Sequence, residues 1–149
     1  MKFEIIEKEI KNNFDLSDKL WCVFTGISKQ KLEFEKWVFF TDKELSENLS
    51  NFYEKFVKNN KKISVLIVDI IKNIEEIKTL EQLKKVDILT DGIFIGDIKD
   101  ESIWWFILPN TNNITSVKQA IDTIKQKNEF SSKNVNIYVF NTTRFTFEN

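Results

Sequence analysis

Apolar residues recur along this chain with two periods, one typical of helices and one typical of strands. Phe3, Ile6 and Ile10 follow the helical period near the start of the sequence. Two aromatic, strand-like runs come next, LWCVFTGI and KLEFEKWVFF, and the polar residues 28–31 between them indicate a turn. We therefore expect a short N-terminal helix over residues 3–13, followed by a β-hairpin.

The best-marked helix is expected from about residue 42 to residue 58. Thr41 and Glu44 have the spacing of a capping box. The apolar positions after them share one helical face: Leu45, Leu49, Phe52 and Phe56. The run KISVLIVDI follows, and it is apolar on both alternations, as in a central strand covered on both faces. We expect this strand to end at Asp69.

The second half of the chain predicts two further helices and three or four strands. A helical stripe follows the central strand: Ile74, Ile77, Leu80 and Leu83. Residues 92–98 and 102–108 predict an antiparallel hairpin, and another helix with Val117, Ile121 and Ile124 inward follows it. NVNIYVF predicts a last strand, and RFTF a short edge.

This order of elements predicts an α+β fold. From residue 42 onward, right-handed crossovers would bring the elements into a ferredoxin-like βαββαβ sandwich with helices packed on the sheet. No Ser/Gly/Pro-rich linker divides the chain, so we expect a single domain over residues 1–149. Residues 1–41 would form an N-terminal helix and aromatic hairpin added to a core of residues 42–149.

Composition narrows the chemistry. The 22 basic and 23 acidic residues give a formal net charge of −1, which argues against nucleic acid or an anionic membrane as a partner. The chain has no histidine, so the commonest general base and zinc ligand are absent. The single cysteine, Cys22, is interpreted as a small buried hydrophobe. Because no apolar run approaches a membrane span or a signal peptide, we expect a cytoplasmic protein.

Several segments resemble a GGDEF domain, the diguanylate cyclase module, over roughly residues 40–141. KISVLIVDI resembles the family's first core strand, which ends in a metal-binding aspartate, here Asp69. WFILPNTNNITSVKQAIDTIK resembles its second hairpin strand, the Leu-Pro-x-Thr exit and the helix after it. The resemblance implies two GTP-loaded protomers facing each other, with metal ions held by Asp69 and a hairpin carboxylate.

The signature of that family is degenerate in this chain. Counted back from Leu108, its five positions hold the residues 100–104, DESIW, so that both glycines are replaced by side chains. A turn longer by two residues would move Asp100 and Glu101 onto the acidic positions, but Ile98 and Lys99 would then replace the glycines. Bulky groups crowd the nucleotide pocket in either register. The product-inhibition motif is reduced to Asp91, with Ile88 in the arginine position.

The leading interpretation is therefore a catalytically inactive, degenerate GGDEF-like domain that serves as a regulatory or protein-interaction module in bacterial signalling. One alternative is a module that binds a guanine nucleotide or cyclic-di-GMP without turnover. An active cyclase is the other. We expect no resident cofactor, and Mg²⁺ only where a nucleotide is bound.

The candidate site residues follow from these interpretations. The metal candidates are Asp69, Asp100 and Glu101. The candidates for nucleotide binding are Asp69, Asp97, Lys99, Asp100, Glu101 and Ser102. The alternative is a structural role, in which Asp69 caps a strand end and the other residues form a solvent-exposed polar turn.

The aromatic hairpin supplies a candidate interaction surface for a protein partner or for a second copy of the chain. Its members are Trp21, Phe24, Trp37, Phe39 and Phe40. The same aromatic residues would equally suit a hairpin that packs on the domain as an added sheet edge.

Overall fold

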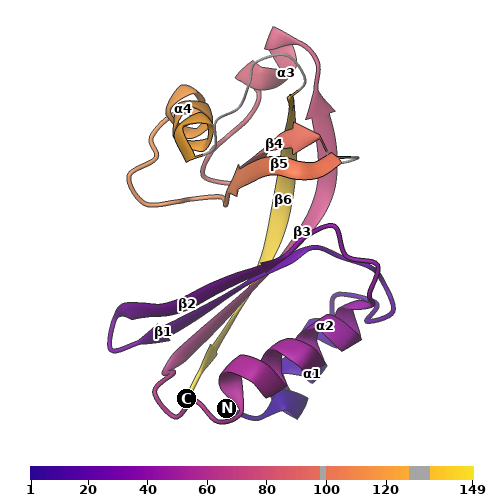
Figure 1. Cartoon of the computed structure of the whole chain (residues 1–149), viewed down its shortest axis with the longest axis vertical. Helices are drawn as coiled ribbons and strands as arrows, with labels where there is room; N and C mark the ends of the chain where they lie inside the picture. Colours follow the sequence, from indigo (N-terminus) through magenta and orange to yellow (C-terminus); the bar gives the residue numbers. More distant parts are fainter. Residues whose placement is uncertain (98–99, 128–134) are drawn as a thin grey trace. The chain divides into compact units, whose positions relative to one another are not determined.

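Helices and strands alternate along the chain much as the apolar pattern predicts. The computed structural model describes residues 1–97, 100–127 and 135–149, with the backbone alone at residues 97 and 100–103. None of the helices in these ranges is both long enough and apolar enough to cross a membrane. The elements are α1 (Phe3–Lys11), β1 (Cys22–Ser28), β2 (Lys31–Val38), α2 (Leu45–Phe52), the π-helical turn η1 (Tyr53–Val57), β3 (Val65–Ile77), α3 (Leu80–Lys84), β4 (Asp91–Asp97), β5 (Asp100–Ile107), α4 (Val117–Lys127) and β6 (Asn136–Glu148) (Figure 1).

The strands form one sheet in the order β2-β1-β3-β6-β4-β5. The pairings of β1 with β2 and β3, and of β4 with β5 and β6, are all antiparallel. The α+β class is confirmed. The ferredoxin-like arrangement is not confirmed, because that prediction relied on crossovers between parallel strands, whereas β6 lies between β3 and β4 in the observed order.

The chain divides into two compact units. The first comprises Met1–Ile70 and Thr143–Asn149, and the second comprises Ile71–Thr142. β3 and β6 each pass from one unit into the other. The predicted boundary after residue 41 does not coincide with this division, because residues 1–41 share the first unit with α2.

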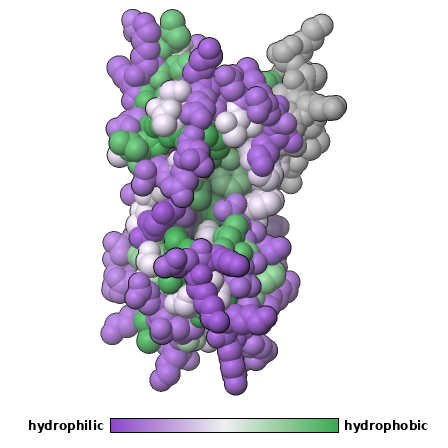
Figure 2. Space-filling model, turned by 90° about the vertical axis from the view of Figure 1, so that its left-hand side faces the viewer, coloured by the Kyte–Doolittle hydropathy of each residue, from purple (hydrophilic) through white to green (hydrophobic). Residues whose placement is uncertain are grey.

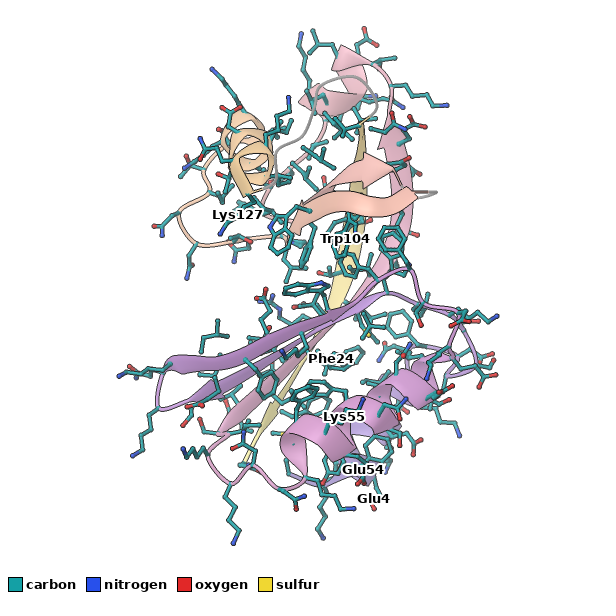
Figure 3. The ribbon with its side chains drawn as sticks, viewed as in Figure 1. Glu4, Phe24, Glu54, Lys55, Trp104 and Lys127 are labelled. Atoms are coloured by element: carbon teal, nitrogen blue, oxygen red, sulfur yellow. The ribbon has the colours of Figure 1, made fainter. Side chains whose placement is uncertain are left out.

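The core of the first unit lies between α1 and α2 and one face of β1 and β3 (Figure 1). Ile6 and Ile10 of α1 are buried there, as the helical spacing predicts. Phe24 of β1 is fully buried, and its ring stacks on Phe52 of α2 with centroids 3.9 Å apart. Figure 3 shows Phe24 directed from the sheet toward α2. Its assignment to an interaction surface is therefore wrong, since β1 is an inner strand and directs this side chain into the core.

The N-terminal hairpin is confirmed, and it packs as an added edge of the sheet. Its turn consists of Lys29 and Gln30, which both have positive φ, at 47° and 65°. Positive φ at both central residues is the type I′ geometry that matches the twist of paired strands. Farther along, Phe34 lies opposite Gly26, and its ring covers the space that a Cβ at this glycine would need.

Two local predictions between residues 41 and 84 are wrong. Thr41 does not cap a helix: its Oγ1 accepts from the Lys43 backbone and the Asn48 amide, and α2 begins at Leu45 without a side-chain cap. β3 does not end at Asp69 but continues to Ile77, so the helix expected after it shrinks to α3. The capping box lies instead at Thr79, whose side chain accepts from the Gln82 backbone.

The second unit packs α4 against β4. Ala120 and Ile124 of the helix contact Ile93 and Ile95 of the strand, and these four side chains are buried. The helix begins after Ser116, whose Oγ accepts from the Gln119 backbone at 3.1 Å. β6 is a single strand of 13 residues, so the predicted break between NVNIYVF and RFTF does not occur.

The second unit repeats the glycine–aromatic pairing of the hairpin. Gly92 of β4 lies opposite Phe140 of β6, and a Cβ at residue 92 would overlap the phenylalanine ring. Glycine is thus required at residue 92 because a neighbouring side chain lies directly over its backbone.

We expect Gly92→Ala to lower the free energy of unfolding by about 1–3 kcal/mol, the usual cost of overpacking. Chemical denaturation measures this loss. In a Phe140→Leu background the same substitution should cost clearly less, because the smaller side chain leaves room for the methyl group. Equal losses in the two backgrounds would contradict the steric explanation.

Candidate functional site

Asp69 is the central residue of the predicted site, and the structure places it in a buried ion pair. It lies in β3 opposite Val23 of β1 and is 1% exposed. Arg144 of β6 donates to both of its oxygens, from Nε to Oδ1 at 2.8 Å and from Nη2 to Oδ2 at 3.0 Å. This is the bidentate arrangement in which a planar guanidinium matches a carboxylate.

The pair determines what Asp69 can do chemically. The hydrogen bonds that Arg144 donates to Asp69 raise the pKa of its guanidinium, although desolvation by burial acts to lower that pKa. Arg144 therefore stays charged. A metal ion at Asp69 would have to displace this cation from both oxygens. The geometry therefore assigns Asp69 to structural pairing.

Most of the other predicted ligands lie outside what the structure describes. The side chains of Asp97, Asp100, Glu101 and Ser102 are not described, and Lys99 lies outside the described residues altogether. The backbone alone shows that Asp97 pairs with Asp100 at the end of the β4–β5 hairpin. Within the described ranges, no three His, Cys, Asp or Glu side chains come close enough to share a metal ion.

The remaining aromatic residues of the predicted interaction surface lie around the hairpin. Trp21 stacks on Phe39 with centroids 4.9 Å apart and contacts Phe40 at 4.8 Å. These three side chains are half-buried, whereas Trp37 is 40% exposed. The hairpin aromatics thus form contacts with one another in addition to any role at a surface.

A polar pocket of about 490 Å³ opens in the second unit. Asn141 donates to Asp91 at 2.8 Å, and Asn73 donates to Asn141 at 3.4 Å. The second oxygen of Asp91 accepts from the Asp87 backbone at 2.9 Å. Asn73 has a φ of 54°, a conformation that asparagine adopts more readily than most residues. Sequence reasoning did not bring these residues together, because the two asparagines are 68 residues apart along the chain.

The lining of this pocket combines both charges with apolar groups. Glu75, Gln82 and Lys85 contribute polar side chains, and Ile77 and Val139 contribute apolar ones. A volume of this size and a few convergent polar groups are typical of small-molecule sites.

A second hollow, of about 330 Å³, lies between α3 and α4 and is mainly apolar. Leu83 of α3 and Val117 and Ile121 of α4 line it, with Lys84, Lys118 and Asp122 beside them. The sequence predicted Leu83, Val117 and Ile121 as inward-facing positions, yet all three remain only half-buried.

Cys22 fits the interpretation as a buried hydrophobe. Its side chain is 0% exposed, and burial raises the pKa of the thiol to about 12. A thiol that stays protonated in this way is a poor nucleophile.

Comparisons with known proteins provide information on the fold of this chain. The chain is similar to the solved structure of an uncharacterized protein, PH0010, from Pyrococcus horikoshii. It is 13% identical to this chain, with a TM-score of 0.66 over 97% of this chain and 86% of that one. No family model matches the sequence, and no curated protein matches it. The similarity extends to the fold alone.

Arg144→Met should destabilise the protein, because it leaves the buried Asp69 carboxylate without its partner. The loss should lie near the lower end of the about 3–5 kcal/mol typical of broken buried pairs, since Arg144 retains contact with solvent. Arg144→Lys keeps the charge but loses the fork, so an intermediate loss is expected. Denaturant titration measures the free energy of unfolding of these variants. The double variant Asp69→Leu/Arg144→Met should recover part of the lost stability, because it removes the buried charge as well. An Arg144→Met variant as stable as the parent would contradict this prediction.

Glu35 of β2 makes stability depend on pH. Desolvation, and then the negative charge of Asp69, raise the pKa of the Glu35 carboxyl above its ordinary value of 4.5. The folded state holds this proton more tightly than the unfolded chain does, so stability should fall as pH rises from 4.5 through the folded pKa. Glu35→Gln should therefore be more stable than the parent at pH 7 but not below pH 4, as measured by thermal unfolding. Glu33→Gln on the same strand is the matched control for the loss of one carboxylate from β2.

Proposed function

We propose that this chain is a non-catalytic regulatory or interaction module that acts through a protein partner. In terms of the resemblance to GGDEF domains, it would be a degenerate member in bacterial signalling, and the ferredoxin-like arrangement expected from the order of its elements is part of this proposal. The activity of the cyclase family would have been lost, and the fold kept as a scaffold for binding.

The observation that carries this proposal is that Asp69 is buried in an ion pair with Arg144. In the resemblance, Asp69 holds the metal ion that activates a ribose hydroxyl. Here Arg144 engages both of its oxygens, at 2.8 and 3.0 Å. A carboxylate that is 1% exposed and neutralised by a guanidinium has little capacity to bind a divalent cation as well.

Two further observations support the same proposal. The buried Cys22 thiol, with its raised pKa, offers no nucleophile. The glycines that let a nucleotide approach the main chain in the cyclase family are replaced by side chains in either register of residues 98–102.

A second candidate function, binding of a guanine nucleotide without turnover, is favoured by the polar pocket. Carboxylate oxygens such as those of Asp91 accept from the N1–H and N2–H donors of guanine, and amides such as those of Asn73 and Asn141 donate to its O6. Lys85 in the same lining is a cation suited to a phosphate group. This pocket lies in the second unit, whereas Asp69 belongs to the first.

Incubation with GTP and Mg²⁺ or Mn²⁺ should yield no cyclic dinucleotide, with chromatography as the readout. Turnover by the parent that Asp69→Asn abolishes, while circular dichroism shows the variant folded, would overturn the proposal.

Thermal shift on the same samples tests the second candidate function, binding of a guanine nucleotide without turnover. A nucleotide at 100 times its Kd should add ~2.7 kcal/mol of stability, and Asn141→Leu should remove that gain. Light scattering at several concentrations shows whether a second copy of the chain is the partner.

A further inference from the structure

The hollow between α3 and α4 presents an apolar floor bounded by two helices. Leu83 forms one wall, and Val117 and Ile121, one helical turn apart, form the other. Leu80 lies one turn before Leu83 on α3 and is 66% exposed, so the apolar surface extends beyond the groove itself. Figure 2 views the molecule from the side on which α4 is drawn in Figure 1, and it shows hydrophobic groups at the surface among hydrophilic ones.

Each wall of this groove carries a lysine at its rim. Lys84 stands on the α3 wall, and Lys118 stands on the α4 wall, with Asp122 one turn after it. Both lysines are exposed, and within the described part of the chain neither lies within 4.0 Å of a carboxylate. A third lysine, Lys125, lies two turns after Lys118 and so on the same face of α4. Acidic groups along the edges of an occupant would complement these charges.

The walls also determine the backbone conformation of an occupant. The residues that line both walls belong to helices, so the groove presents side chains and no open strand edge in the described residues. An extended peptide over this floor would leave its own N–H and C=O groups unpaired against apolar surface, which costs free energy. A helix satisfies these groups within itself and presents an apolar face with polar flanks.

We infer that the groove between α3 and α4 binds an amphipathic helix of a partner protein, one with an apolar stripe flanked by acidic residues. The stripe lies on Leu83, Val117 and Ile121, and the acidic flanks lie against Lys84 and Lys118. This inference rests on the proposed function of an interaction module and names both its surface and the chemistry of its partner.

Synthetic peptides test this inference on the full chain. The probe is a helix of about 16 residues, long enough to form in part on its own, with leucines at i, i+3, i+4 and i+7 and glutamates on the flanks. A twin carries lysines in place of the glutamates, and a scrambled twin has no apolar stripe. Fluorescence anisotropy should show the acidic peptide binding at least tenfold more tightly than either twin. Backbone amide shifts in NMR spectra should change at α3 and α4.

Charge reversal supplies the decisive comparison. Lys84→Glu/Lys118→Glu should invert the preference, so that the lysine peptide binds more tightly than the glutamate peptide. Because both residues are exposed and unpaired in the described structure, the melting temperature should change little. Lys127→Glu is the matched control, since residue 127 lies on the opposite side of α4 from residue 118. It should leave the preference as it is in the parent.

The results separate this inference from the proposed function. Equal binding of the acidic and lysine peptides, tighter binding of the scrambled peptide, or shifts confined to elements other than α3 and α4 would overturn the inference while leaving the proposed function intact. Cyclic dinucleotide formation that Asp69→Asn abolishes would overturn the proposed function whatever the peptides do. Tight acidic-peptide binding that inverts with the charge reversal supports both the groove and its occupant.

Discussion

The ion pair between Asp69 and Arg144 constrains both the fold and the function of this protein. It joins β3 to the C-terminal part of β6 across 75 positions of sequence, inside the first unit. The carboxylate is almost completely buried, so it is stable there only while the guanidinium neutralises it. The same contact occupies the oxygens that a metal ion would need. The pair that stabilises the buried carboxylate thus also leaves Asp69 little capacity to bind a metal ion.

The pair also shows where sequence reasoning reaches its limit. Asp69 was recognisable as unusual, because it interrupts an apolar strand. Arg144 carried a signal as well, since it is the only arginine in a chain that uses lysine elsewhere for positive charge. What the sequence alone does not show is that these two residues meet, because a contact over such a separation depends on the order of strands in the sheet. The surroundings of the β4–β5 turn stay a prediction.

The local predictions succeeded where one period dominated and failed where two were superimposed. Ile6 and Ile10 have no competing pattern, and α1 lies where they indicate. Ile74 and Ile77 continue with Leu80 and Leu83 at helical spacing, yet the first two lie in β3. Asn73 has a positive φ, which interrupts the alternation of side chains between the two faces of β3. The apolar residues on either side of it therefore do not follow the strand period in the sequence. The Thr41 motif failed for another reason: α2 begins at Leu45 with Glu44 at its N-cap position, so Thr41 lies before the helix end and its hydroxyl accepts from Lys43 and Asn48 instead.

The discontinuity of the first unit has a consequence for how the protein is made. Residues 71–142 are synthesised as one stretch and contain all of the second unit, so every residue of this unit is present before Thr143 is added. The first unit begins earlier but receives Thr143–Asn149 only afterwards. Until Arg144 has been added, Asp69 lacks the partner that neutralises its carboxylate in the folded unit. The unit whose synthesis begins earlier is thus completed after the other.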